Sequence, residues 1–111
     1  MSQFVFLYRG GMGGDVSPAE MQQQMERWMT WLKELGDKGF IKDMGQPLER
    51  TGKVVSGKQK VVTDGPFAEK DLVSGYTLIE AQSLSQAAEL ATGCPVFLYG
   101  GAVEVRPVAK M

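Results

Sequence analysis

Carboxylates, a lysine and an aromatic ring fall within one short stretch of the chain, which reads Asp-Gly-Pro-Phe-Ala-Glu-Lys-Asp from Asp64 onward. A carboxylate near apolar groups can have its pKa moved toward the range in which it transfers protons, and a neighbouring lysine can hold an anion. The stretch therefore predicts a candidate site, with Asp64 and Glu69 as catalytic acids and with Arg9, Phe67 and Tyr76 as ligand-binding residues. The alternative is structural: Asp64 caps a turn and Phe67 fills the core.

Several other kinds of chemistry are excluded by residue counts. The chain has no histidine and one cysteine, which removes imidazole acid–base catalysis, a haem held by histidine and a cysteine-based zinc site. No spaced set of carboxylates suggests an all-oxygen metal site, so we expect no metal and no cofactor. The glycine-rich segment from Gly10 to Gly14 departs from the dinucleotide-binding fingerprint because Val16 replaces its third glycine, and we interpret it as a loop.

Length and composition indicate one globular domain spanning residues 1–111. Hydrophobic residues make up 43% of the chain and charged residues 23%, and the net charge of -1 argues against a nucleic-acid or anionic-membrane partner. No apolar run approaches the roughly 20 residues of a membrane span. The lone Cys94 cannot form an internal disulfide, so we expect a reducing, cytoplasmic location.

The first half of the sequence contains signals for the strands and the helix that must position the site. Phe4 to Tyr8 is predicted as a strand because it is short, aromatic and β-branched. Ser17, followed by proline and then by glutamate three residues on, predicts the start of a helix of about 18 residues. Its apolar positions are expected to form one core-facing stripe, namely Met21, Met25, Trp28, Leu32 and Leu35. Phe40 to Glu49 contains glycine and proline and is predicted as an edge-like or bulged strand.

The second half adds a hairpin, a strand, a helix and a strand. Gly57-Lys58 is predicted to form a type II′ turn between two short strands, and their lysines are interpreted as protection of an exposed edge. Leu72 to Glu80 is predicted as a strand. Ser83 opens a second helix, and Val103 to Val108 is predicted as the last strand.

This order predicts an α+β, ferredoxin-like β-α-β-β-α-β fold with an accessory β-hairpin, in which both helices cover one face of an antiparallel sheet. The first strand, however, is apolar on both sides, with Phe4, Phe6 and Tyr8 on one face and Val5 and Leu7 on the other. A second copy packed sheet to sheet would cover the remaining face. The sequence therefore predicts a homodimer.

The chain also resembles a known family. The string from Val62 to Glu69, the later Gly-Tyr-Thr-Leu-Ile and the ending Val-Glu-Val-Arg-Pro are similar to those of the DGPF branch of the YCII-related proteins. The resemblance covers nearly the whole chain and implies a dimeric α/β barrel. It brings no established reaction, and the histidine–aspartate pair proposed to act in YciI-type relatives cannot be carried over because histidine is absent. The segment after Glu69 is one residue shorter than the common pattern, which weakens any role assigned to Glu69.

Two functional hypotheses remain open at this point. The first is a homodimeric small-molecule-binding domain whose catalytic form would be a cofactor-independent enzyme with Asp64 or Glu69 as proton-transfer group. The second is a regulatory or protein-interaction module, since the resemblance implies an association of some members with sigma factors of transcription. The fold alone does not choose between them.

Overall fold

The structure is a computed structural model that describes residues 1–10, 16–66 and 72–110. Its elements follow one another in the order β1 (Ser2–Arg9), α1 (Pro18–Asp37), β2 (Ile41–Asp43), β3 (Gly52–Ser56), β4 (Val61–Gly65), β5 (Val73–Ala81), α2 (Leu84–Ala91), a 3₁₀-helix η2 (Pro95–Tyr99) and β6 (Ala102–Pro107). The chain thus has the α+β composition that the sequence predicts.

Four strands form the main sheet, in the spatial order β2-β5-β1-β6, and every neighbouring pair is antiparallel. With β3 and β4 set aside as an accessory pair, the four strands are the first, second, third and fourth of a β-α-β-β-α-β chain. The first and third then lie in the centre and the second and fourth at the edges, which is the ferredoxin-like arrangement. The predicted fold class is confirmed.

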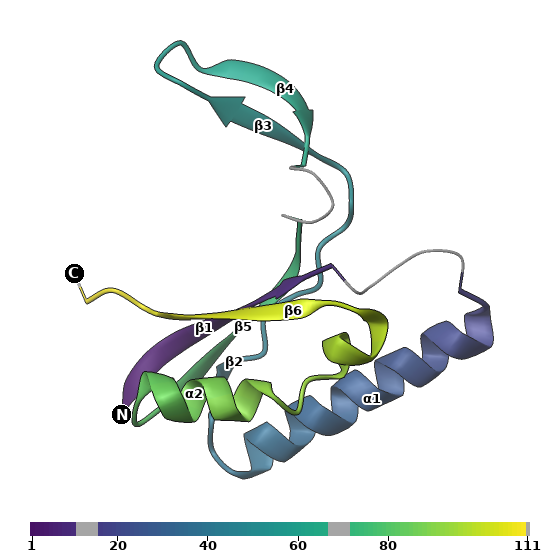
Figure 1. Ribbon diagram of the computed structural model, residues 1–111, viewed down its shortest axis with the longest axis vertical. Coiled ribbons are helices and arrows are strands. Elements are labelled where there is room, and N and C mark those ends of the chain that lie inside the picture. The colour runs from purple at the N-terminus through teal and green to yellow at the C-terminus, as the bar shows by residue number, and fades with distance from the viewer. Residues whose placement is uncertain (11–15, 67–71, 111) are drawn as a thin grey trace.

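Both helices lie on one side of this sheet (Figure 1). The β1 side chains on that side, Phe4, Phe6 and Tyr8, are all buried. Phe6 is fully buried and its ring stacks against Trp31 of α1, with centroids 6.0 Å apart. Because side chains alternate along a strand, the intervening β1 residues face away from the helices. The helix-side core is therefore complete within one chain, while the opposite face of the sheet is not covered by α1 or α2.

Helix α1 begins where the sequence predicts, with the Ser17 hydroxyl accepting a hydrogen bond from the backbone N–H of Glu20 at 3.2 Å. The predicted core stripe is partly wrong, because Met21 and Met25 are 52% and 60% exposed. Of the other predicted positions, Leu35 is buried and Trp28 and Leu32 pack partly buried against the core. Gln24 and Trp31 are buried as well, although the predicted stripe did not include them. The two tryptophans are the bulkiest side chains on the helix and pack against β1. Met21 and Met25 consequently lie outside this contact and are exposed.

The hairpin is present, but its predicted two-residue turn is wrong. Ser56 pairs with Val61, so the loop consists of the four residues 57–60, in which Gly57 and Lys60 have positive φ angles of 75° and 58°. Strands β3 and β4 form a separate sheet that projects away from the main sheet (Figure 1). Val55, Val61 and Val62 are more than half exposed on it. The hairpin therefore adds little to the core of this chain.

The segment predicted as an edge strand is regular only over the three residues of β2, and its register against β5 is irregular. Beyond it the chain continues along the edge of β5, where Pro47 bridges to Gly75 and the backbone N–H of Leu48 donates to Ser74 O at 2.8 Å. Gly45 permits this path because it has φ 72°, and a Cβ there would lie 1.8 Å from the carbonyl oxygen of Tyr76. We call residues 44–47 the edge segment.

No helix in the described part of the chain is long and apolar enough to cross a membrane.

The close approach of Gly45 to β5 yields a stability prediction. Gly45→Ala should destabilise the fold by about 2–4 kcal/mol, because it adds a backbone collision to the strain of a left-handed residue. Gly57→Ala is the matched control: its φ is 75°, yet nothing lies within 4 Å of an added Cβ. It should cost only about 1 kcal/mol. Urea unfolding measures both variants, and equal losses would contradict the described path of the edge segment.

Candidate functional site

The predicted catalytic residue Asp64 lies on β4 of the projecting hairpin. Its side chain is 94% exposed and pairs with Lys53 across the hairpin, with Oδ1 and Nζ 2.8 Å apart. Phe67 and Glu69, the other two predicted residues of this stretch, lie outside the described residues. Among the described residues, the Asp64 carboxylate is therefore exposed to solvent and not enclosed by apolar groups.

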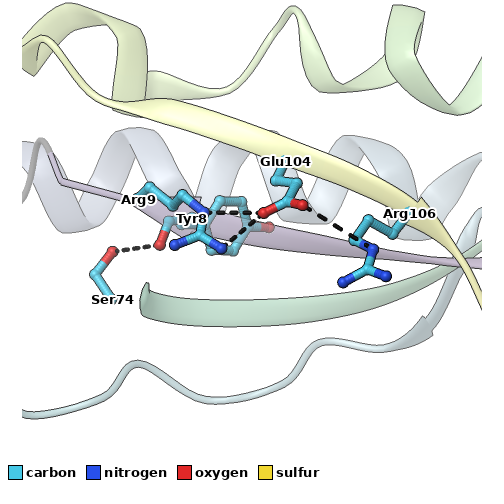
Figure 2. A network of polar contacts seen from close by, with 5 residues as sticks. All are labelled: Tyr8, Arg9, Ser74, Glu104 and Arg106. Carbon is cyan, nitrogen blue, oxygen red and sulfur yellow. Dashed lines mark hydrogen bonds and ion pairs between the residues drawn. The ribbon is translucent and has the colours of Figure 1, made fainter. Parts of the chain in front are cut away.

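Arg9, a predicted ligand-binding residue, lies on the sheet face that carries no helices (Figure 2). Its Nε and Nη2 donate to the same oxygen of Glu104, at 2.9 and 2.7 Å. The other Glu104 oxygen lies 4.0 Å from Nε of Arg106. The side chains of Arg9 and Glu104 are 30% and 39% exposed. The arrangement is a charge row of three residues that connects β1 with β6.

The apolar part of that same face adjoins the charge row. Leu7 pairs with Glu104 on one side and with Tyr76 on the other, while Val5 pairs with Arg106 and Leu78. Directly paired residues of an antiparallel sheet point to the same face. Val5, Leu7, Tyr76 and Leu78 therefore form one apolar patch, which we call the open face, and each of them is only partly buried in this chain.

An apolar cavity, partly open to solvent, lies between α1, the edge segment and the start of β5. Its volume is about 250 Å³. All of its described lining residues are uncharged at neutral pH. They are Tyr8, Met25, Trp28, Met29, Leu32, Met44, Gly45, Gln46, Pro47, Ser74, Gly75, Tyr76 and Thr77. Tyr76 is the predicted site residue that lines this cavity, at its junction with the open face. Arg9 and Asp64 are not on this wall.

Most of the cavity wall was not identified from the sequence. Its residues come from four separate segments, and only the folded chain brings them together. One signal was present, because the chain contains seven methionines and such residues are enriched at adaptable binding surfaces. Met25 and Met29 of α1 and Met44 of the edge segment are all exposed and all line the cavity. The binding-surface interpretation suits Met25 better than core packing does.

A buried chain of hydrogen bonds closes one side of the cavity. The Tyr8 hydroxyl donates to Thr77 Oγ1 at 2.7 Å, and the Thr77 hydroxyl donates to the backbone carbonyl of Met44 at 2.9 Å. Thr77 is buried, and burial raises the pKa of the Tyr8 hydroxyl, which keeps it a neutral donor. These bonds join β1, β5 and the edge segment, so they fix the distance between the sheet and one wall of the cavity.

Part of the wall is aromatic. The ring of Trp28 lies edge to face against Tyr8, with centroids 4.7 Å apart and planes at 84°, and Trp28 meets Trp31 at 5.9 Å and 80°. The indole Nε1 of Trp28 is shielded from solvent and has no hydrogen-bond partner among the described residues. A buried donor without an acceptor costs about 1–3 kcal/mol. The cavity wall therefore includes a tryptophan whose N–H has no acceptor within the part of the chain that the structure describes.

A second, wider depression of about 740 Å³ lies between α1 and η2. Its lining includes the charged residues Glu26, Arg27 and Glu34, and it contains none of the predicted site residues. Among the residues that the structure describes, no group of three or more His, Cys, Asp or Glu side chains is placed to hold a metal ion. The cavity between α1 and the edge segment is the better candidate because it is apolar, has a few polar groups on its wall and includes Tyr76.

The buried Tyr8 hydroxyl predicts alkaline destabilisation. An unfolded tyrosine ionises near its ordinary pKa of 10.0, whereas burial keeps folded Tyr8 protonated to higher pH. Above pH 10 the unfolded state then binds fewer protons than the folded state, so the free energy of unfolding falls by up to about 1.4 kcal/mol per pH unit. Below that pH the Tyr8 contribution is fully present. Burial likewise raises the pKa of Cys94 from 9.0 to about 12. Ionisation of Cys94 in the unfolded state therefore lowers the free energy of unfolding further above pH 9.

The contribution of Tyr8 to this alkaline loss of stability is measured by comparing the wild-type chain with Tyr8→Phe in urea unfolding between about pH 8 and pH 11. The variant should start less stable by about 1 kcal/mol, because it loses the bond to Thr77, and then decline less steeply. Parallel declines in the two proteins would show that Tyr8 is accessible to solvent.

Comparison with known proteins agrees with this architecture. The YCII-related domain matches residues 11–111, which is nearly the entire chain. A search among curated proteins found no significant match. A match of this extent establishes the family, although a shared fold does not define a reaction. With its ferredoxin-like sheet, its one-sided helix layer and its domain match, the chain belongs to the YCII-related domain family.

Proposed function

We propose that this chain is a homodimeric domain that binds a small molecule in the cavity between α1, the edge segment and β5. The observation that carries the binding half is the cavity itself, which is apolar, partly open to solvent and bordered by a fixed polar group on Tyr8. Binding sites for small molecules are commonly of this kind, with apolar walls and a few converging polar groups. Within the family we assign the chain to the DGPF branch, on the Asp-Gly-Pro-Phe string from Asp64 to Phe67.

The dimer half of the proposal is supported by the open face. Val5, Leu7 and Leu78 are apolar, lie in the middle of the sheet and have no helix over them. The protomer is thin, with a shortest extent of 19 Å, and its radius of gyration is 15.3 Å. A compact domain of this length would have a radius of about 13 Å. Two sheets packed face to face would bury these residues at a spacing of about 10 Å and produce the dimeric α/β barrel.

Acid–base catalysis is not part of this proposal. The hypothesis required a carboxylate near apolar groups, and the Asp64 carboxylate is exposed and paired with Lys53. No described residue on the cavity wall carries a carboxylate. The proposed activity is therefore binding, with Tyr76 as the predicted ligand-binding residue that lines the site.

A second candidate, a protein-interaction module, is favoured by the hairpin. Val55 and Val62 pair directly across β3 and β4, and both are about 60% exposed, at 63% and 59%. A two-stranded hairpin with exposed valines gains stability when another surface covers it. A protein that copurifies with this chain from its native host and is lost from Val55→Ser and Val62→Ser variants would support this candidate.

The dimer is tested by a charge placed on the open face. Leu7→Asp should convert a particle of about twice the 12.1 kDa chain mass into a monomer, because sheet packing would bury the carboxylate without a partner. Leu84→Asp is the control, since Leu84 is 48% exposed on α2 at the other side of the sheet. Sedimentation equilibrium gives the masses. A wild-type monomer, or dissociation by the control, would contradict the proposed interface.

The binding site is tested by mapping neutral fragments onto the chain with ¹H–¹⁵N NMR spectra. We expect their shifts to concentrate at the edge segment and the start of β5, and to weaken at least several-fold in Met25→Trp, which narrows the cavity. Met21→Trp is the matched control, because Met21 lies one turn earlier on α1, is similarly exposed and is not on the described wall. Shifts centred on Asp64, or equal effects of both variants, would remove the cavity as the site.

A further inference from the structure

The accessory hairpin of β3 and β4 has little cover within this chain. Among the described elements, its two strands make extensive contact only with each other. A two-stranded hairpin alone in water is marginally stable at best. We infer that the hairpin packs against a second copy of the chain through one of its faces, that of Val55 and Val62. The inference rests on the proposed dimer and adds a second contact surface to the open face.

The two faces of the hairpin differ in character. Val55 and Val62 pair directly across the strands, so their side chains point to one face, where they are 63% and 59% exposed. The ion pair of Lys53 and Asp64 lies two residues further along each strand and therefore on the same face. The opposite face mixes two valines with two hydroxyl side chains. An apolar centre beside a polar margin is the usual composition of an interface between proteins.

The hairpin lies on the side of the sheet that the proposed partner would occupy. Figure 1 shows β3 and β4 across the main sheet from α1 and α2, which is the side of the open face. The chain measures only 19 Å along the direction of this view, so the hairpin lies in the same narrow slab as the sheet. Each of its strands has five residues and is roughly 17 Å long, whereas packed sheets are about 10 Å apart. A partner on the open face would thus meet the hairpin as well.

The surface area of the chain indicates how much a partner has to cover. A folded monomer of 12.1 kDa exposes about 6,000 Å² of accessible surface. This chain exposes 7,800 Å², which is roughly 1,800 Å² more. An interface of standard size covers about 800 Å² on each partner, and the interfaces of obligate dimers are larger. The excess is more than a standard contact on the open face alone would remove, and it agrees with an interface that includes the hairpin.

A second copy fits both surfaces at once. Two copies related by a two-fold axis present the same surface to each other, so each hairpin reaches the other copy in the same way. The open face and the valine face of the hairpin then belong to one continuous interface. An unrelated protein bound to the hairpin alone would leave the apolar residues of the open face without cover.

Two neighbouring valines of β4 provide a matched test. Val62 and Val61 are 59% and 51% exposed, and they point to opposite faces of the same strand. We expect Val62→Ser to raise the Kd of the dimer at least 10-fold, because each dimer loses two buried valines, and Val61→Ser to change it less than about 2-fold. Sedimentation equilibrium of the whole chain gives these constants. An unchanged Kd in Val62→Ser, or an equal rise in both variants, would overturn the inference.

Mixed dimers of isotope-labelled and unlabelled chain test the contact in the wild-type protein. NOEs between the two copies should appear at the methyl groups of Leu7 and Val62 and be absent at Val61. NOEs between copies at Leu7 without any at Val62 would overturn the hairpin contact and leave the proposed dimer intact. Their absence at both positions, together with a monomer mass, would instead overturn the proposed dimer. A copurifying protein that is lost from Val62→Ser while the Kd of the dimer stays unchanged would assign the hairpin to that protein and overturn the inference.

Discussion

The alternation of apolar side chains along β1 is the constraint on which the rest of the structure depends. Phe4, Phe6 and Tyr8 point toward the helices and Val5 and Leu7 point away, so the central strand has two apolar faces. Helix α1 brings both tryptophans to the first face and satisfies it within one chain. Among the described residues, no helix covers the second face. Burial of the central strand is therefore incomplete within these residues, and the proposed dimer would complete it.

Tyr8 connects this core with the cavity. Its ring packs against Trp28 on the helix side, and its hydroxyl begins the hydrogen-bonded chain through Thr77 to the edge segment. Part of the wall is therefore held by buried hydrogen bonds, while three exposed methionines, whose side chains are intrinsically flexible, form another part. A fixed polar part and a flexible apolar part suit the proposed small-molecule site.

Local patterns predicted the fold well, and long-range packing explains most of what they missed. The capping signals at Ser17 and Ser83 located both helix starts, and the residue types of β1 and β5 identified the central strands. The hairpin turn was mispredicted because Gly57 was assigned to a two-residue turn, whereas pairing of Ser56 with Val61 makes the loop longer. Met21 and Met25 were wrongly assigned to the α1 stripe because spacing alone cannot tell which apolar residues the tryptophans displace.

The candidate site was predictable only in part, for a related reason. Tyr76 was identified from its neighbourhood in the sequence and does line the cavity, but Trp28, Thr77 and Met44 come from other elements and meet only in the folded chain. Asp64 was singled out by its neighbours in the sequence, yet the hairpin carries it into solvent. Neighbourhood along the chain indicates which residue types are present. It does not indicate which of them share a cavity.

The central claim is that burial of the β1 strand is completed by a second copy, and the concentration dependence of unfolding tests it most directly. A chain whose folded state is stabilised by association unfolds at a higher midpoint as the protein concentration rises. Urea unfolding followed by tryptophan fluorescence over about a hundredfold range of concentration should therefore show the midpoint increasing steadily. A midpoint that does not change across this range would mean that the single chain shields its own sheet, and the proposed dimer would be wrong.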